Sequence, residues 1–245
     1  MEDSIKRQLF CGIIVKSIAV IASIYGIMRT ASGIMTFTYF TNLSNIAVDI
    51  ILFVFLILDI KALTGRDKIK AKPNVLYIIK FMLTISITLT FLVYMFLLAP
   101  TNEAGILASY FRNYAGSFCV HFITPVLAIA DFFLFDYMYK STSMHAFYAV
   151  VPPLVYVIYV VIAGYSGIRW NGTMYAPYNF LNFGAPTGWL GYDLSKLGSE
   201  SLGIGVAYMI IVLLLIFIGI GFLYLKIKDI RNRAVMRKYK EKVEQ

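Results

Sequence analysis

Six long apolar runs dominate this sequence and restrict what the chain can fold into. They cover about residues 9–27, 41–60, 75–99, 117–138, 146–164 and 203–225. A run of about 20 apolar residues is long enough to cross the hydrocarbon core of a bilayer as a helix. A segment inside hydrocarbon must satisfy its own backbone hydrogen bonds, which a helix does. The sequence therefore predicts an all-α integral membrane protein built as a six-transmembrane-helix bundle.

The rest of the chain fits a single domain over residues 1–245. Of these residues, 60% are hydrophobic and 14% are charged, which is too little polar surface for a water-soluble domain. A loop over 165–202 and a basic tail over 226–245 are the long segments outside the runs. The first run carries Lys16 and no cleavage site follows it, so we expect it to be retained rather than removed as a signal peptide.

The basic residues predict the orientation of the bundle. With six spans, 16 of the 22 Lys and Arg residues lie on the side of the two termini, and four lie on the opposite side. Cytoplasmic loops carry such an excess, so both termini are expected in the cytoplasm, and the membrane is expected to be a bacterial plasma membrane. The tail from Lys226 onward is expected to contact anionic lipid headgroups. This distribution disfavours a nucleic-acid partner.

The outer loop 165–202 is rich in aromatic residues. They are Trp170, Tyr175, Tyr178, Phe180, Trp189 and Tyr192. Such residues form belts at membrane interfaces, and they can also cap a cavity that opens outward. Both interpretations stay open.

The second run begins with polar residues that helical spacing places on one face. Thr41, Ser44, Asn45 and Asp49 share that face. Ser and Asn inside membranes commonly form hydrogen bonds between helices. Asp49 needs a partner or a proton there, so it is a candidate functional charge.

The fourth run contains His121, which we expect at the same depth as Thr41, because both runs cross from outside to inside. A hydroxyl and an imidazole at hydrogen-bonding distance are the minimal nucleophile and base for acyl transfer. The other histidine, His145, is expected in a short solvated loop. Lys16 matches the depth of Asp131, which predicts an ion pair between them.

Other polar positions have simpler interpretations. Asp59 and Asp136 lie near the cytoplasmic ends and are expected to be hydrated. Pro152 and Pro153 should kink the fifth span and widen the bundle, so that Tyr156 and Tyr159 donate into a cavity.

The sequence predicts neither a metal site nor a bound cofactor. The two histidines are expected near opposite faces of the membrane, and no glycine-rich phosphate loop appears. Cys11 and Cys119 lie inside predicted spans and are expected to be packing residues rather than a disulfide.

Three segments resemble the androgen-induced, six-span membrane hydrolase family, and still more closely its uncharacterised bacterial relatives. The segments are 39–45, the stretch from His121 to Pro125 with the acid Asp131 downstream, and the aromatic-proline stretch 175–181. Animal members use a membrane-embedded threonine and histidine to hydrolyse fatty acid esters of hydroxy fatty acids. The resemblance implies Thr41 as nucleophile and His121 as base. The chain departs from the animal pattern at Asp131, where those members carry Glu.

Two functions are compatible with these patterns, and so is a purely structural scaffold in which the polar residues only join helices. The first is an intramembrane lipid esterase that acts on a fatty acyl ester through Thr41 and His121, with Asn42, Asn45, Tyr156 or Tyr178 as donors to the oxyanion. The second is a non-enzymatic carrier or receptor for an apolar or weakly acidic ligand, in which Lys16, Asp49 and Asp131 serve as internal charges.

Overall fold

The computed structural model describes residues 2–65, 72–100, 105–136, 138–198 and 200–243. Arg66, Lys68 and Lys70, which count among the basic residues predicted on the side of the termini, lie outside this part. The described residues divide into two compact units. One comprises 1–149 with 220–245, and the other comprises 150–219. We call them the helical unit and the loop unit. The sequence had predicted one domain over this length.

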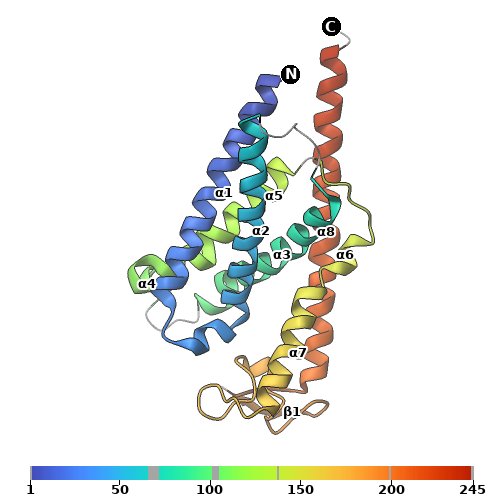
Figure 1. The fold of residues 1–245 in the computed structure, drawn as a ribbon. Helices are drawn as coiled ribbons and strands as arrows, with labels where there is room; N and C mark the ends of the chain where they lie inside the picture. Colours follow the sequence, from blue (N-terminus) through green and yellow to red (C-terminus); the bar gives the residue numbers. More distant parts are fainter. Residues whose placement is uncertain (1, 66–71, 101–104, 137, 199, 244–245) are drawn as a thin grey trace. The chain divides into compact units, whose positions relative to one another are not determined.

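The helical unit is built from the following elements: α1 (Glu2–Thr30), η1 (Ile34–Thr38), α2 (Phe40–Leu63), α3 (Asn74–Val93), η2 (Tyr94–Leu98), α4 (Ile106–Phe118), η3 (Cys119–Ile123), α5 (Thr124–Phe135), α6 (His145–Tyr148) and the second part of α8 (Val206–Val243). Helix α1 packs on α2, α4 and α5, and α3 packs on α2 and α5 (Figure 1). The start of α1 and the end of α8 lie at the same end of this unit (Figure 1).

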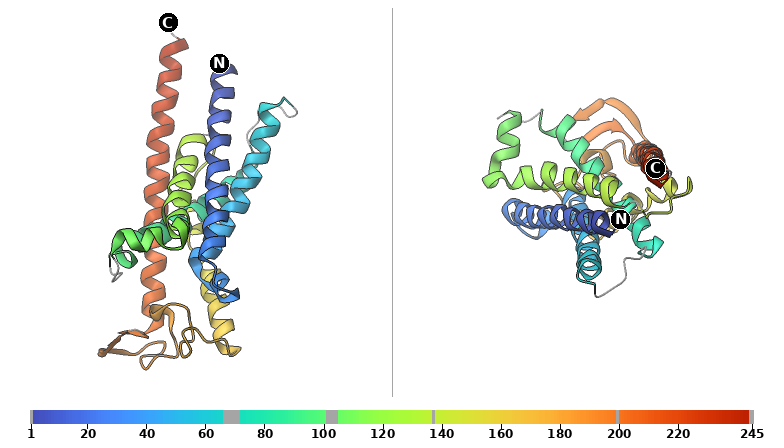
Figure 2. Two further views of the ribbon diagram at one scale, coloured as in Figure 1. Left: turned by 90° about the vertical axis from the view of Figure 1, so that its left-hand side faces the viewer. Right: turned by 90° about the horizontal axis from the view of Figure 1, so that it is seen from above.

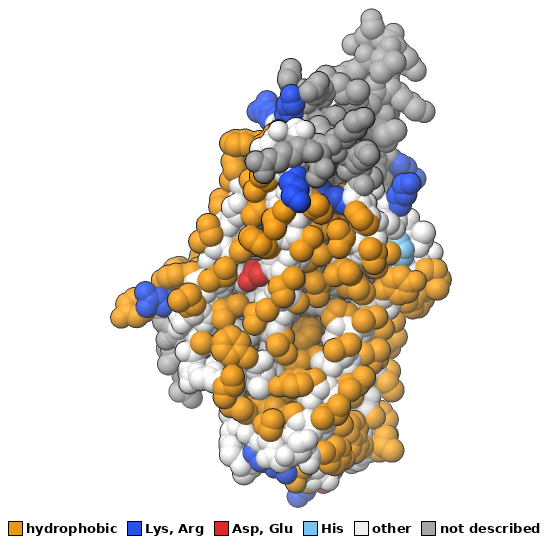
Figure 3. Space-filling model, viewed as in Figure 1, with side chains coloured by type: hydrophobic (Ala, Val, Ile, Leu, Met, Phe, Trp, Pro, Cys, Tyr) orange, Lys and Arg blue, Asp and Glu red, His pale blue; other side chains and the backbone are white. Residues whose placement is uncertain are grey.

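The core of the helical unit is made of aliphatic residues from four helices. Its buried members are Ala19, Val48, Leu52, Ile87 and Ala128. Outward-facing positions are also apolar, and hydrophobic side chains cover most of the surface over α1 and α2 (Figure 3). A soluble protein rarely exposes so large a continuous apolar surface, whereas lipid tails solvate one.

Helix α4 lies crosswise to α1 over most of its length (Figure 2). The backbone turns at Tyr114 and Ala115, whose φ angles of 53° and 61° are left-handed. Each such residue costs roughly 1–2 kcal/mol. The segment that is long and apolar enough to cross a membrane begins at Tyr114 and continues through η3 into α5.

Gly26 and Gly116 allow α1 to approach the fourth span closely. A Cβ at Gly26 would lie 2.7 Å from the Val120 side chain and 2.8 Å from the Gly116 carbonyl oxygen. A Cβ at Gly116 would lie 2.6 Å from Cβ of Arg29. Small residues at helix contacts are typical of membrane bundles, because they let two backbones meet.

The loop unit contains α7 (Val151–Tyr165), η4 (Asn179–Leu181), β1 (Tyr192–Gly198), β2 (Ser201–Ile204) and the first part of α8. Strands β1 and β2 pair antiparallel, with Tyr192 opposite Ile204 and Gly198 opposite Ser201. The chain is thus not purely α-helical, since the predicted outer loop folds a hairpin.

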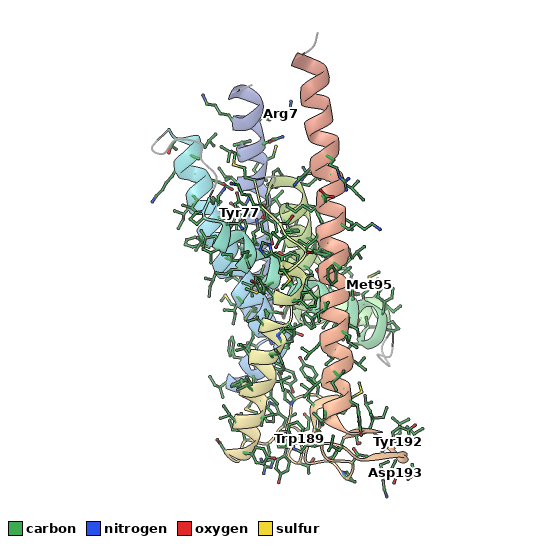
Figure 4. The ribbon with its side chains drawn as sticks, turned by 90° about the vertical axis from the view of Figure 1, so that its right-hand side faces the viewer. Arg7, Tyr77, Met95, Trp189, Tyr192 and Asp193 are labelled. Carbon is green, nitrogen blue, oxygen red and sulfur yellow. The ribbon has the colours of Figure 1, made fainter. Side chains whose placement is uncertain are left out.

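Aromatic side chains pack the inside of the loop unit. Phe183 stacks on Tyr165 and on Trp189, with ring centroids 4.9 Å and 5.3 Å apart. Trp170 is almost fully buried. Trp189, Tyr192 and Asp193 follow one another along this loop (Figure 4).

Pro152 and Pro153 lie in the first turn of α7, not in the middle of a helix. The predicted fifth span is instead divided between α6 and α7 by a turn at 149–150. Proline fits a first helical turn because its missing N–H would have no intrahelical partner there. The helix is thus interrupted just before the two prolines, and the predicted kink of the fifth span stays a prediction.

Candidate functional site

Thr41 and His121 belong to adjacent segments of the helical unit. Thr41 is half-buried in the first turn of α2, and His121 lies in η3, a single π-helical turn between α4 and α5. A π turn inserts one extra residue into a helix and is frequent at functional sites. The π turn cannot be recognised from the sequence.

Asn45 joins these two segments. Its side-chain nitrogen donates to the Thr41 carbonyl oxygen at 2.8 Å and to the Val120 carbonyl oxygen at 3.3 Å. Both carbonyls therefore lie within hydrogen-bond distance of one nitrogen. The backbone of Thr41 and the residue preceding His121 are brought together by this fully buried amide.

The imidazole of His121 is positioned by aromatic stacking rather than by a hydrogen bond. It stacks on Tyr94 with centroids 3.6 Å apart and planes 6° from parallel. Its Nδ1 is buried and has no hydrogen-bond partner. Within the described chain, no hydrogen bond joins the Thr41 hydroxyl to the His121 ring.

Tyr94 is in turn held by contacts of its hydroxyl group and by packing of its ring. It opens η2, the second π turn, and its hydroxyl lies 2.8 Å from the Ser109 carbonyl oxygen and 2.7 Å from Ser117 Oγ. Tyr110 packs edge-on against Tyr94 with centroids 5.1 Å apart, and its buried Oη has no partner. Burial and the nearby Tyr94 raise the pKa of Tyr110, so its hydroxyl remains a donor.

The sequence interpretation missed Tyr94 and Tyr110. A tyrosine in an apolar run is normally assigned to the interface belt. Their proximity to His121 depends on two π turns and on the crosswise path of α4, none of which has a sequence signature.

The four predicted oxyanion donors differ in the hydrogen bonds they already make and in the unit to which they belong. Both N–H bonds of Asn45 are engaged, one by each carbonyl. Asn42 donates to the Thr36 carbonyl oxygen at 2.8 Å and keeps a second N–H. Tyr156 and Tyr178 belong to the loop unit, where their ring centroids lie 6.3 Å apart.

A second polar group lies in the helical unit and consists of buried charges. Lys16 Nζ lies 2.6 Å from Asp131 and 3.0 Å from Asp59. This confirms the predicted ion pair of Lys16 and Asp131. Lys80 pairs with Asp131 on its other oxygen and with Asp136 at 2.7 Å. Asp131 is thus shared by two lysines and has no exposed surface.

Asp59 and Asp136 are 3% and 2% exposed, so the expectation that they are hydrated is wrong. Asp59 also pairs with Lys72 at 2.6 Å. Lys228, assigned from the sequence to a headgroup-facing tail, is fully buried and donates to the Phe132 carbonyl oxygen at 3.0 Å. These charged residues near the ends of spans face inward because several helices place their bonding partners at the same depth.

His145 is buried too, contrary to the prediction of a solvated residue. Its Nδ1 lies 2.7 Å from the Tyr139 hydroxyl, and the two rings stack. Burial raises the pKa of Tyr139, so its hydroxyl stays the donor in this contact.

Asp49 stands apart from the charge cluster. It is half-buried, and its Oδ1 has no hydrogen-bond partner. Ser23 on α1, whose hydroxyl is buried, interacts with this carboxylate. Asp49 is the predicted internal charge that lacks a cation.

Neither cysteine is paired. Cys11 is exposed, Cys119 is half-buried, and both are free thiols. Among the described residues, no three His, Cys, Asp or Glu side chains converge in a way that could hold a metal ion.

Five segments of the described chain are long and apolar enough to cross a membrane. They are Lys6–Thr30, Asn74–Phe96, Tyr114–Phe135, His145–Tyr165 and Val206–Arg233. The class defined by this fold is a mostly helical chain compatible with a multi-pass membrane protein. The remaining predicted span lies within α2, a helix of 24 residues.

Comparisons with protein-family models, with curated proteins and with solved structures find no match. The resemblance to the six-span hydrolases therefore stays a prediction that rests on the quoted residues.

Proposed function

We propose that this protein is an intramembrane lipid esterase, with Thr41 as nucleophile and His121 as general base, acting on a fatty acyl ester such as a fatty acid ester of a hydroxy fatty acid. The observation that carries the proposal is the Asn45 amide, which holds the Thr41 and Val120 carbonyls together. A buried imidazole nitrogen without a partner supports it as well, because a base needs an open lone pair.

In this reaction the Thr41 hydroxyl oxygen attacks the ester carbonyl carbon, and His121 takes the hydroxyl proton. The tetrahedral oxyanion collapses, breaks the bond to the leaving alkoxide, and leaves an acyl group on Thr41. His121 returns the proton to the alkoxide. Water then attacks the acyl-threonine with the same base and releases the fatty acid.

Several neighbours would assist. The second N–H of Asn42 is available to stabilise the oxyanion, and one such donor is worth roughly 3 kcal/mol in known enzymes. The ring of Tyr94 would set the imidazole plane by stacking. Catalytic hydrogen bonds are often long in free enzymes and tighten in the substrate complex, so the Thr41–His121 contact would form with substrate bound.

The test is ester hydrolysis by the purified protein in nanodiscs. We expect Thr41→Ala and His121→Ala to lower kcat by roughly 10²-fold or more, because each removes a reacting group. Thr64→Ala is the matched control: it removes an exposed threonine at the other end of α2 and should leave turnover unchanged. Wild-type turnover in either folded site variant would exclude the dyad. Covalent labelling of Thr41 by a fluorophosphonate would support it directly.

The buried charges favour a second candidate function, a carrier or receptor for an apolar or weakly acidic ligand. Ionisable groups inside membranes commonly mark ion or substrate pathways. Asp49 has no cation partner among the described residues, unlike Asp131, so it would be the group that exchanges a proton or a ligand. Ligand-dependent flux in liposomes that Asp49→Asn abolishes and Thr41→Ala preserves would favour the carrier over the esterase.

We further propose six spans with both termini in the cytoplasm, as the basic bias predicts. The α1 start and the α8 end at one end of the helical unit support an even number of crossings (Figure 1).

A further inference from the structure

A pocket of about 450 Å³ lies in the helical unit between α1, α5 and α8. Its lining combines basic, polar and apolar residues: Arg7, Gln8, Cys11, Leu134, Phe135 and Arg231. It is separate from Thr41, at the start of α2, and from His121, which lies in η3 at the other end of the fourth span. The proposed esterase reaction makes no use of it.

Two guanidinium groups give this pocket its charge, and no acidic residue lines it. Arg231 donates through Nη2 to the Leu134 carbonyl oxygen at 2.7 Å, and its Nη1 is buried without a hydrogen-bond partner. Within the described chain neither arginine forms an ion pair. The carboxylate that acts electrostatically on Arg231 is Asp136, which already pairs with Lys80.

The pocket sits where the apolar part of α1 begins. Figure 4 places Arg7 near the N-terminal end of α1, and the apolar segment of that helix starts at Lys6. Phe10 and Ile14, one and two turns further along, are 55% and 42% exposed. A ligand held by the arginines would therefore have an apolar helix surface directly beside it.

Arginine matches phosphate through paired N–H donors, and basic pockets between transmembrane helices bind lipid headgroups. We propose that this pocket binds the phosphate group of an anionic glycerophospholipid, whose acyl chains lie along the exposed face of α1. The recognised group is the phosphate ester anion, and the lipid is its source.

The experiment measures binding to lipid-depleted, full-length protein in neutral detergent. The probes are phosphatidylglycerol, phosphatidylcholine and inorganic phosphate, each titrated and followed by native mass spectrometry and by thermal shift. We expect tighter binding of phosphatidylglycerol than of phosphatidylcholine. Arg7→Gln should weaken phosphatidylglycerol binding about tenfold, since it removes one charged hydrogen-bond donor.

Arg231→Gln should weaken binding similarly, although it also removes the contact to Leu134. Arg7→Gln removes no described hydrogen bond, so it keeps the test valid if Arg231→Gln fails to fold. Arg233→Gln is the matched control, because Arg233 lies on α8 two residues away, exposed and paired with Asp229. It changes the net charge equally and should bind like wild type.

Equal phosphatidylglycerol binding by Arg7→Gln, Arg233→Gln and wild type would overturn the site. Inorganic phosphate binding as tightly as the lipid would overturn the assignment of the lipid as source. Neither result depends on ester hydrolysis, so this inference and the proposed esterase can fail separately.

Discussion

Asp131 is the residue on which the buried charge cluster depends. It has no exposed surface and pairs with both Lys16 and Lys80, which reach it from α1 and α3. A buried carboxylate is costly to desolvate, and the two cations offset that cost. Asp131 therefore fixes the positions of three helices at one depth.

Replacing Asp131 by Asn should destabilise the protein by about 3–5 kcal/mol, because two lysines lose a shared carboxylate in a buried site. The measurement is the free energy of unfolding in detergent, from a denaturant titration. Asp229→Asn is the matched control, since Asp229 forms an exposed pair with Arg233 on α8. Such exposed pairs contribute about 0.3–0.5 kcal/mol. Equal effects of the two substitutions would contradict the role given to Asp131.

At the scale of elements, the contact of α1 with the fourth span depends on two glycines. Gly26 and Gly116 face one another, and neither has room for a methyl group. The atoms that a Cβ would meet include backbone, which cannot rotate away. This contact positions η3, and with it His121.

Gly26→Ala should lower the free energy of unfolding by about 1–3 kcal/mol, the usual cost of overpacking. Gly219→Ala on α8 is the control, because a Cβ there has open space within 4 Å. It should be neutral or slightly stabilising, since Ala is the better helix former. Thermal unfolding of both variants in the same detergent provides the comparison. If Gly26→Ala leaves the free energy of unfolding unchanged, the two helices can move apart without loss of stability, which would contradict this prediction.

At the scale of the whole molecule, the orientation in the membrane decides which segments face each side. The basic residues predict cytoplasmic termini. The hairpin β1–β2 would then be outside, together with the rest of the loop 165–202.

Single-cysteine labelling tests this orientation in intact cells. In a background without Cys11 and Cys119, Ser195→Cys in the exposed hairpin should react with a membrane-impermeant maleimide. Arg233→Cys, at an exposed position in the C-terminal part of α8, should react only after the cells are opened. The reverse pattern would invert the topology, and labelling of both positions in intact cells would exclude six spans.

The helices were predictable to different degrees. The runs at 9–27 and 75–99 became long helices near those bounds, because length and apolar content alone specify a crossing helix. The run at 146–164 was divided by a turn, and the run at 203–225 began as strand β2 before α8. The two prolines set the start of α7, and the hairpin sets the start of α8. The hairpin in turn depends on the pairing of β2 with β1.

By itself, the sequence determined that the chain is mostly helical and apolar, because the bilayer permits few other structures for runs of this length. It also determined the pairing of Lys16 with Asp131, since helical rise converts residue position into depth. Only the tertiary structure decided that Asp59, Asp136 and His145 are buried and that Tyr94 stacks on His121. The physical reason is that burial and ring contacts depend on side chains from distant segments, and no local pattern encodes those neighbours.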